Sequence, residues 1–517
     1  MSSSLNRRDI LKLLALLPTS LYFSRLFQTA ARPSTNPDAK NVLIVLLDAL
    51  TAKNIQLYGY PRDTMPNLAR MADRATVYHA HYSGGNFTTP GTSSLLTGTY
   101  PWTHRAVGLG RKVLESMRHR SLFAFFDDYY RTAYSHNNFV NTLLRQFFAD
   151  IDYLKPQKDL FLRNFLAADR LFGSDEDIAS VAWQRDAKRQ GNGGYAYSLF
   201  FSSLYDGLDE ARMRDLIALF PRGIPRIGTD DFFLLEQGVD WILSQVVKIP
   251  QPFLGYFHFL PPHHPYSPRR DYVGVFYNDS LGYYFQKPKS VFNHNEEISM
   301  TIQTNERRRY DEYLLYADGQ IGRIYDFLLE RGIVDNTWVV FTSDHGEMFE
   351  RGIFGHRTPV LYQSIVRIPL LIIEPGQQQR RDVYTSTNAV DVLPTLLKVT
   401  GHAIPDGLEG TVLPPFDTQA PGAERSLFCV EAKESSDSYH KPLFPVSTMI
   451  VKGKYKLTRY VGYKELGSRD PWYELYDVEN DPEEMNDLSA SQPRLAAELR
   501  DELEHEQAAA EQPYQGG

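Results

Sequence analysis

Acidic and imidazole side chains follow two apolar segments of the chain. The segment Asn41–Leu47 ends at Asp48, and the segment Thr337–Thr342 is followed closely by Asp344 and His345. Carboxylate oxygens and an imidazole nitrogen are ligands that divalent cations accept. A single aspartate after an apolar segment could have a purely structural role, as a cap or a turn residue. Two segments that both end in such residues favour a metal site.

A polar, glycine-flanked segment at residues 84–101 supplies hydroxyl groups. It leads into a helix that we expect to begin at Ser93. Backbone N–H groups at a helix N-terminus favour an anion, and a hydroxyl that touched a metal ion would become a nucleophile. Capping of the helix by Thr92 or Ser93 is the simpler alternative.

Three histidines offer substrate contacts or proton transfer. His263 and His264 stand between prolines, so their loop should be rigid. One of them could donate to an anionic substrate oxygen, or both could be solvated. His356 lies twelve residues after Asp344 and could protonate a leaving group or bind a second metal ion.

The segments that position these residues alternate between strand and helix patterns. The two largely apolar runs predict strands buried on both faces, as in a parallel sheet covered by helices. Ligands bind at the carboxyl ends of such strands. The predicted fold class is therefore α/β, with a doubly wound sheet and helices on both faces. Further predicted elements are a strand at residues 368–373 and helices at residues 306–331 and 390–399.

Two regions depart from this alternation. Residues 150–250 are rich in aromatic side chains and are interpreted as an insertion that shapes or covers a pocket. Residues 421–510 are predicted to form a small antiparallel subdomain. Its elements are short strands at residues 448–451, 453–458 and 473–477 and a helix at residues 493–506.

The composition excludes several classes of protein. With 517 residues the chain is long enough for two domains, or for one large domain with a subdomain. Lys and Arg number 55 against 63 Asp and Glu, a net charge of −8, which argues against a nucleic-acid-binding protein. The single cysteine, Cys429, excludes an intramolecular disulfide and a multi-cysteine metal site.

The N-terminal residues 1–35 are interpreted as an export signal. Arg7 and Arg8 precede a short apolar run at residues 13–23, the arrangement of a twin-arginine signal. That run is shorter than the ~20 residues that a membrane-spanning helix needs. We therefore expect an exported, periplasmic or extracellular protein whose membrane contact is limited to this segment, cleaved or retained as an anchor. The alternative is an ordinary amphipathic helix with an incidental arginine pair.

Motifs across residues 40 to 490 resemble the sulfatase-like branch of the alkaline phosphatase superfamily. They keep the family order along the chain. They are the strand ending at Asp48, the segment 88–101, the segment 263–266, the segment 335–347 with Asp344 and His345, and the segments 367–370, 391–397 and 474–482. The resemblance implies that fold, with a catalytic domain over residues 40–420.

The resemblance also implies roles for individual residues. Asp48, Asp344 and His345 match metal ligands of the family, and Thr88 falls where sulfatases carry the cysteine or serine that becomes formylglycine. His263 matches a substrate-binding histidine, and His356 falls where sulfatases have a lysine and some phosphoesterase-like relatives a histidine. His264 is the adjoining candidate for substrate contact. His136 and Asn138 fall near a segment that holds the sulfate in sulfatases.

The departures from the family pattern point away from a formylglycine enzyme. Residues 88–92 read Thr-Thr-Pro-Gly-Thr, without a convertible Cys or Ser and without the following arginine. Threonine is the nucleophile in nucleotide pyrophosphatase/phosphodiesterases and in phosphoethanolamine and glycerophosphate transferases of the superfamily. Ala49 after Asp48 resembles the phosphonate monoester hydrolases and those transferases. No segment for a second zinc site is apparent, so one divalent metal ion is expected, Mn²⁺, Zn²⁺, Ca²⁺ or Mg²⁺, with a second left open.

These implications lead to a metal-dependent hydrolase of phosphoric or sulfuric esters that acts through Thr88. The favoured types are a phosphodiesterase and a phosphonate monoester hydrolase, and the expected substrate is a small anionic ester, a glycan or a lipid. Three alternatives remain: an arylsulfatase-like enzyme, a transferase of phospho-headgroups, and a non-catalytic binding protein with the same fold. The sequence carries no signal for an oligomeric state.

Overall fold

The computed structural model describes residues 38–162, 213–228, 231–279, 287–292, 299–356, 359–417 and 425–515. The predicted export signal and the central part of the predicted insertion lie outside the described residues. Among the helices of the described part, none has the length and apolar character needed to cross a membrane.

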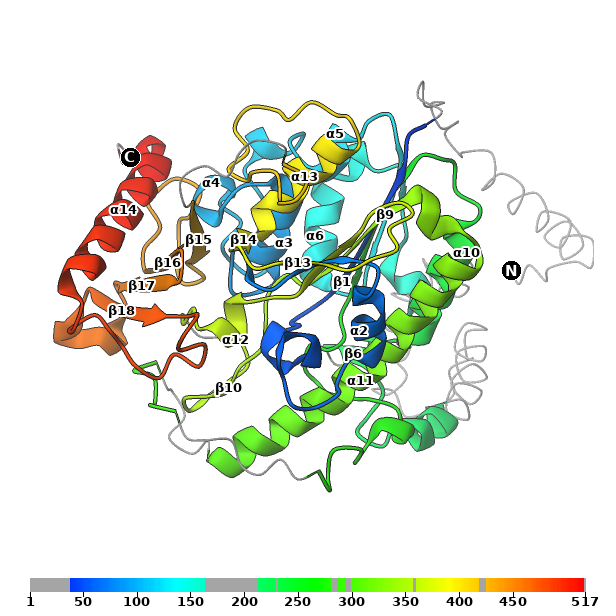
Figure 1. Cartoon of the computed structure of the whole chain (residues 1–517), viewed down its shortest axis with the longest axis horizontal. Coiled ribbons are helices and arrows are strands. Elements are labelled where there is room, and N and C mark those ends of the chain that lie inside the picture. Colours follow the sequence, from blue (N-terminus) through cyan, green and yellow to red (C-terminus); the bar gives the residue numbers. More distant parts are fainter. Residues whose placement is uncertain are drawn as a thin grey trace, which may run out of the picture.

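A mixed sheet of eight strands forms the centre of the molecule (Figure 1). Its central strand, β1 (Asn41–Leu47), pairs in parallel with β8 (Phe253–Phe259) on one side and β9 (Thr337–Thr342) on the other. All seven residues of β1 are buried, as the largely apolar run predicts. In sheet order the strands are β13 (Arg381–Val383), β2 (Thr76–Tyr78), β12 (Leu370–Ile373), β9 (Thr337–Thr342), β1 (Asn41–Leu47), β8 (Phe253–Phe259), β4 (Tyr130–Ser135) and β5 (Tyr153–Leu154).

Helices cover both faces of this sheet, which confirms the predicted fold class (Figure 1). Alternate residues of β1 point to opposite faces: Leu43, Val45 and Leu47 pack into one apolar core, and Val42, Ile44 and Leu46 into another. The first core contains α2 (Pro66–Ala72), α10 (Leu235–Val246) and α11 (Met300–Glu330). The second contains α3 (Thr88–Thr97), α5 (Leu122–Phe125), α6 (Asn138–Gln146) and α13 (Val392–Val399).

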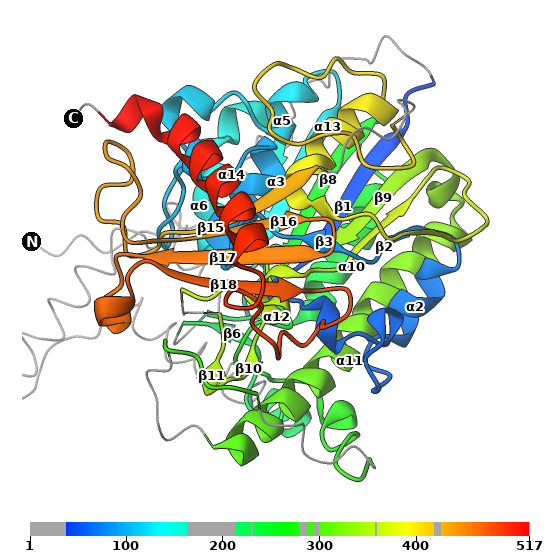
Figure 2. The ribbon, with the colours of Figure 1, turned by 60° about the vertical axis from the view of Figure 1, so that its left-hand side comes forward.

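The C-terminal part forms a separate antiparallel sheet of four strands (Figure 2). Its order is β15 (Ser426–Glu431), β16 (Val446–Lys452), β17 (Tyr455–Val461) and β18 (Trp472–Asp477), and α14 (Pro493–Glu511) packs against it. The predicted subdomain is therefore present, and β15 adds a strand that the sequence pattern did not single out. Lys456 of β17 is fully buried and donates to the Leu361 carbonyl at 2.6 Å, which ties this sheet to the larger part of the molecule.

Two sequence expectations need correction. The third predicted strand, β12, runs antiparallel to β9, so the sheet is mixed and not wholly parallel. Helix α3 begins at Thr88 and not at Ser93, so the hydroxyl-rich segment belongs to the helix itself. The remaining short elements are α4 (Pro101–His104), α12 (Gln363–Val366), β3 (His81–Tyr82), β14 (Thr387–Asn388), β10 (Phe349–Glu350), β11 (Ile353–Phe354), β6 (Arg226–Ile227) and β7 (Asp231–Phe232).

Candidate metal centre

The sheet brings Asp48 and Asp344 together because they follow two adjacent parallel strands. Leu46 of β1 lies opposite Thr342 of β9, so the two chains leave the sheet side by side. Their ends are joined by hydrogen bonds from Ala49 N to Asp344 Oδ1 at 3.2 Å and from Leu50 N to Ser343 Oγ at 3.0 Å. The carboxyl ends of neighbouring strands therefore place both carboxylates at one point, as the strand pattern predicts.

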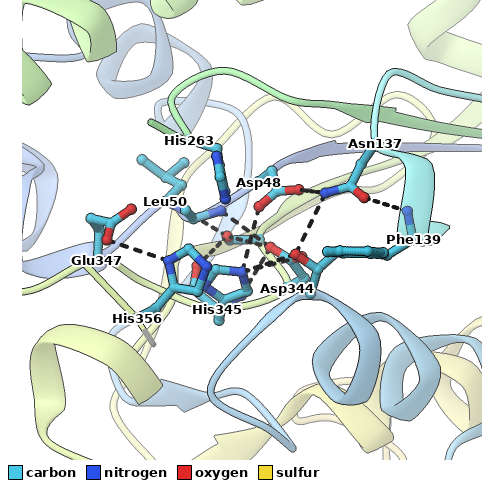
Figure 3. Close-up of polar contacts among 12 residues, drawn as sticks. Asp48, Leu50, Asn137, Phe139, His263, Asp344, His345, Glu347 and His356 are labelled. Carbon is cyan, nitrogen blue, oxygen red and sulfur yellow. Dashed lines mark hydrogen bonds and ion pairs between the residues drawn. The ribbon is translucent and has the colours of Figure 1, made fainter. Parts of the chain in front are cut away.

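Asp48, Asp344 and His345 form a buried cluster that fits a metal ion (Figure 3). One ligand atom from each lies within 4.8 Å of the others. His345 Nε2 is 3.4 Å from Asp48 Oδ1 and 3.6 Å from Asp344 Oδ2, and these two oxygens make no hydrogen bond among the described residues. His345 Nδ1 lies 2.8 Å from the Gly346 carbonyl, so it can carry the proton and leave Nε2 as a ligand.

The electrostatics of the cluster also call for a cation. Burial and the nearby Asp48 carboxylate raise the pKa of Asp344. Burial lowers the pKa of His345, but the Asp344 and Asp48 carboxylates outweigh it and raise that pKa to about 9. Two buried carboxylates thus hold a proton on His345, and a divalent cation can take the place of that proton. The donor set of two oxygens and one nitrogen suits Mn²⁺, Zn²⁺, Ca²⁺ or Mg²⁺.

Thr88 lies beside this cluster at the first position of helix α3. Its Oγ1 is 3.4 Å from His345 Nε2 and 3.5 Å from Asn137 Nδ2. The residue before it, Phe87, makes no side-chain capping hydrogen bond, which leaves the helix N-terminus open to an anion. Gly91 allows helix α3 to lie close to Asp344, because a Cβ atom at this position would collide with the backbone carbonyl of Asp344.

Two further residues contact Asp48, and sequence reasoning missed both. Asn137 caps helix α6 with its Oδ1, which accepts from Phe139 N at 2.7 Å, so its Nδ2 faces Asp48 Oδ2 at 2.6 Å. His258 of β8 is fully buried, with Nε2 at 3.2 Å from Asp48 Oδ2. Asn137 stands where a capping residue is expected, directly before a helix. His258 lies inside an apolar run, where the pattern indicates only a strand.

His263 and His356 lie together next to the cluster (Figure 3). The His356 ring centroid is 4.2 Å from that of His345 and 5.1 Å from that of His263. His356 Nδ1 lies 3.3 Å from Glu347 Oε1. Burial, with His345 and His263 nearby, lowers the pKa of His356, whereas burial raises the pKa of Glu347 to about 7. The structure thus gathers the two histidines that the sequence assigned to catalysis.

The other predicted substrate contacts are not gathered there. His264 is exposed, and its ring packs on Tyr266 and Phe354 with centroids 5.3 and 5.8 Å apart. Asn138 is exposed on helix α6. The His136 ring has no solvent exposure, lies 4.2 Å from the Phe233 ring between centroids, and has its pKa lowered to about 3 by burial. Among the described residues, Asn137, the residue between His136 and Asn138, makes the contact to Asp48.

Fold and site together define a hydrolase of the sulfatase type, with a buried Asp–Asp–His cluster as a candidate metal site. The family model described as "Sulfatase" matches residues 40–402, so the chain belongs to the sulfatase family. A second model, "N-sulphoglucosamine sulphohydrolase, C-terminal", matches residues 349–509. The members of this fold family depend on a metal ion, and the buried cluster provides a place for one.

Curated relatives share part of the chain. Arylsulfatase K of Canis lupus familiaris is 25% identical over 318 residues, which cover 56% of this chain and 58% of the relative. The uncharacterized sulfatase YidJ of Escherichia coli is 30% identical over 265 residues, which cover 49% of this chain and 50% of the relative. The chain thus spans between half and three fifths of the length of these two relatives.

Solved structures share the whole architecture. The phosphonate monoester hydrolase of Agrobacterium radiobacter superposes with a TM-score of 0.65 at 19% identity and covers 91% of this chain and 96% of its own. A protein solved in complex with its substrate D-glucosamine-2-N,6-O-disulfate gives a TM-score of 0.64 at 16% identity. The match covers 93% of this chain and 100% of that protein. At these identities the likeness establishes the fold.

Proposed function

We propose that this sulfatase-family hydrolase cleaves phosphoric or phosphonic esters with Thr88 as its nucleophile. The observation that carries the proposal is the position of the Thr88 hydroxyl, 3.4 Å from His345 Nε2 and beside two carboxylate oxygens that make no hydrogen bond within the described part of the chain. The favoured reactions are those of a phosphodiesterase or a phosphonate monoester hydrolase. The substrate is a small anionic ester, alone or as part of a glycan or lipid.

The residue type at position 88 separates this proposal from formylglycine chemistry. Threonine carries a methyl group on Cβ and cannot be oxidised to formylglycine. The single cysteine, Cys429, is buried in β15 and cannot supply that group. The nucleophile is therefore an unmodified hydroxyl, and this requires a metal ion or a base to activate it.

A divalent cation held by Asp48, Asp344 and His345 would lower the pKa of the Thr88 hydroxyl and offset charge on the substrate. Thr88 Oγ1 attacks phosphorus, a new O–P bond forms, and the bond to the leaving oxygen breaks. Asn137 holds Asp48 and donates toward Thr88 Oγ1. The N–H groups at the start of α3 and the His263 ring face the negative charge that develops on the phosphoryl oxygens.

His356 gives the proton that the leaving oxygen needs. Glu347 orients its ring through Nδ1. Because the pKa of His356 is low, its free ring is neutral, so it takes up the proton that Thr88 releases and passes it to the leaving oxygen. Water then attacks the phospho-Thr88 intermediate, His356 accepts a proton from that water, and the phosphate or phosphonate leaves. Attack by an acceptor alcohol in place of water would make the same site a transferase.

The test compares Thr88→Ala and Thr88→Ser on a panel of aryl phosphate mono- and diesters, phosphonates and sulfates, with Mn²⁺, Zn²⁺, Ca²⁺ or Mg²⁺ added. Thr88→Ala should lose turnover by about 10³-fold or more while it keeps its metal content. Thr88→Ser should retain measurable activity because it preserves the hydroxyl. Activity of Thr88→Ala near that of the wild type would overturn the assignment.

A second candidate, hydrolysis of sulfuric esters, is favoured by membership of the sulfatase family. The same panel of substrates decides between the two candidate functions. Faster hydrolysis of an aryl sulfate than of the matching phosphodiester would favour the sulfuric ester hydrolase over the phosphoric ester hydrolase. Product analysis with an added alcohol separates hydrolase from transferase, since a transferase yields the new ester. A protein with no turnover and no bound metal would instead be a binding module.

We also propose that the chain is exported through its twin-arginine segment. Arg7 and Arg8 before the apolar residues 13–23 support this. Replacing both arginines by lysine should retain the protein inside the cell, measured by fractionation of the host. Unchanged export of the Lys-Lys variant would refute the route.

A further inference from the structure

A cavity of about 650 Å³ lies beside the metal centre but is lined by other residues. It lies between the turn at residues 52–61, the first turns of helix α11, strand β10 and the segment 287–289. Asp48, Thr88, Asp344 and His345 do not line it. It meets the surroundings of the metal centre at Glu347, the residue that holds His356. Its volume is that of a small-molecule site.

Among the described residues, the lining of the cavity carries more positive than negative side chains. Its three carboxylates are those of Glu347, Glu350 and Glu483. Its six cationic residues are Lys53, Lys287, Lys289, Arg307, Arg351 and Arg367. The excess is three positive charges with every group ionised.

Two of the carboxylates are shared among three of the cations. Lys287 Nζ lies 2.8 Å from Glu350 Oε2 and 2.5 Å from Glu483 Oε2. Lys53 Nζ lies 2.6 Å from that same Glu483 oxygen, and Arg307 Nη2 lies 3.3 Å from Glu350 Oε2. Among the described residues, these ion pairs therefore leave a surplus of positive charge in the lining.

The ionisation of these groups reflects a positive local field. Burial works against the charged form of Glu350, yet Lys287, Lys53 and Arg307 lower its pKa. Burial lowers the pKa of Lys53; Glu350 and Glu483 oppose that effect, and repulsion by Lys287 adds to it. A concave site with low-dielectric walls concentrates such a field and attracts anions. Tyr58, Tyr60 and Met300 add apolar surface to the same lining.

We propose that this cavity binds an organic anion with two or more negative charges, at a site distinct from the metal centre. The anion would have a compact sugar-sized or aromatic-sized body, set by the cavity volume, with its charged groups toward the lysines and arginines. Such an anion could be a remote charged group of an ester substrate or a separate small effector. The site stands whether or not Thr88 is the nucleophile.

The probe is 8-aminonaphthalene-1,3,6-trisulfonate, a fluorescent trianion whose C–S bonds an ester hydrolase does not cleave. The metal-loaded full-length protein is titrated with this trisulfonate. Its Kd for the trisulfonate is compared with those of the variants Lys289→Glu and Arg307→Gln. Lys289 is exposed, so its replacement is tolerable for folding. The Arg307 side chain is 12% exposed and pairs with Glu350, and glutamine keeps a polar group there. Arg494→Gln, on a side chain 94% exposed on α14, is the matched control.

We expect Kd to rise at least tenfold in the two cavity variants and to stay unchanged in Arg494→Gln and in His263→Ala. Absence of saturable binding, or equal Kd values in all variants, would overturn the proposal. So would loss of binding in His263→Ala alone, because the trisulfonate would then occupy the metal centre. Thermal midpoints of the variants check that each is folded.

Kinetics with an aryl ester distinguish the two sources of the anion. Competitive inhibition by the trisulfonate that is relieved in Lys289→Glu identifies the site of a remote group of the substrate. A change in kcat at saturating ester that disappears in the same variant identifies an effector site. Inhibition that persists undiminished in both cavity variants contradicts the proposal.

Discussion

Asn137 shows how one side chain can serve the fold and the site at once. Its side-chain oxygen Oδ1 accepts hydrogen bonds from the first N–H groups of α6, so its side-chain nitrogen Nδ2 must face Asp48 and Thr88. The sequence identified the neighbourhood, because His136 and Asn138 flank this position, but not the residue. Where a strand leads into a helix, adjacent residues point in different directions, so one faces the metal cluster and the next faces solvent. The pattern of residue types does not determine which of them faces the cluster.

The prediction at this scale is a loss of activity in Asn137→Asp. Aspartate caps a helix as well as asparagine does, but it cannot donate to Asp48 Oδ2 and adds a like charge beside it. We expect kcat/KM to fall by about 10–100-fold, as for other residues that orient metal ligands, and the metal affinity to change because a charge replaces the donor that holds Asp48. Steady-state kinetics and metal titration measure both effects.

Asn138→Ala is the control, since Asn138 is exposed one residue further along. It should behave as the wild type. If Asn138→Ala lost as much activity as Asn137→Asp, the substrate-binding role predicted for Asn138 from the sequence would regain support.

At the scale of elements, the strand ends were predictable and the helix start was not. Asp48 and Asp344 follow apolar runs that read as buried strands, and adjacent parallel strands necessarily align their ends. Pro90 and Gly91 in the segment argue against an early helix, yet α3 begins at Thr88 because Pro fits a first turn and Gly admits the Asp344 carbonyl. The direction of β12 depends on its neighbours in space, which a local pattern does not encode.

Helix α3 therefore depends on Gly91 for its distance from the metal centre. Gly91→Ala should push the helix away from Asp344, destabilise the protein by about 1–3 kcal/mol and reduce activity more than stability alone would. Urea unfolding and kinetics on the folded variant measure the two effects.

Ser93→Ala tests the same helix two residues later. The Ser93 hydroxyl is buried and has no hydrogen-bond partner among the described residues, so its removal should change stability by less than about 1 kcal/mol. Equal behaviour of Gly91→Ala and Ser93→Ala would show that close packing at Gly91 is unimportant.

At the scale of the whole molecule, buried histidines link stability to pH. His81 is fully buried, and burial lowers its pKa to about 3. In the unfolded chain a histidine takes up a proton near pH 6.5. Between these values the unfolded state binds more protons, so the stability contributed by neutral His81 is present above pH 6.5 and is lost as the pH falls.

His81→Leu removes this linkage. Relative to the wild type, the variant should gain about 2 kcal/mol of unfolding free energy between pH 7 and pH 5, measured by urea unfolding at each pH. His440→Leu is the control, because the His440 side chain is 79% exposed. A constant difference between wild type and His81→Leu across this range would contradict a buried neutral imidazole.

The order of strands in the central sheet has a consequence for biosynthesis. β1, which carries Asp48, is the first strand of the sheet to leave the ribosome, but its partners β8 and β9 begin 212 and 296 residues later. Until both are made, the six apolar residues at positions 42–47, which end up buried, lack a partner strand on at least one side. The nascent chain is thus open to wrong pairing through most of its synthesis, and its yield should depend on chaperones and on expression temperature more than its finished stability would indicate.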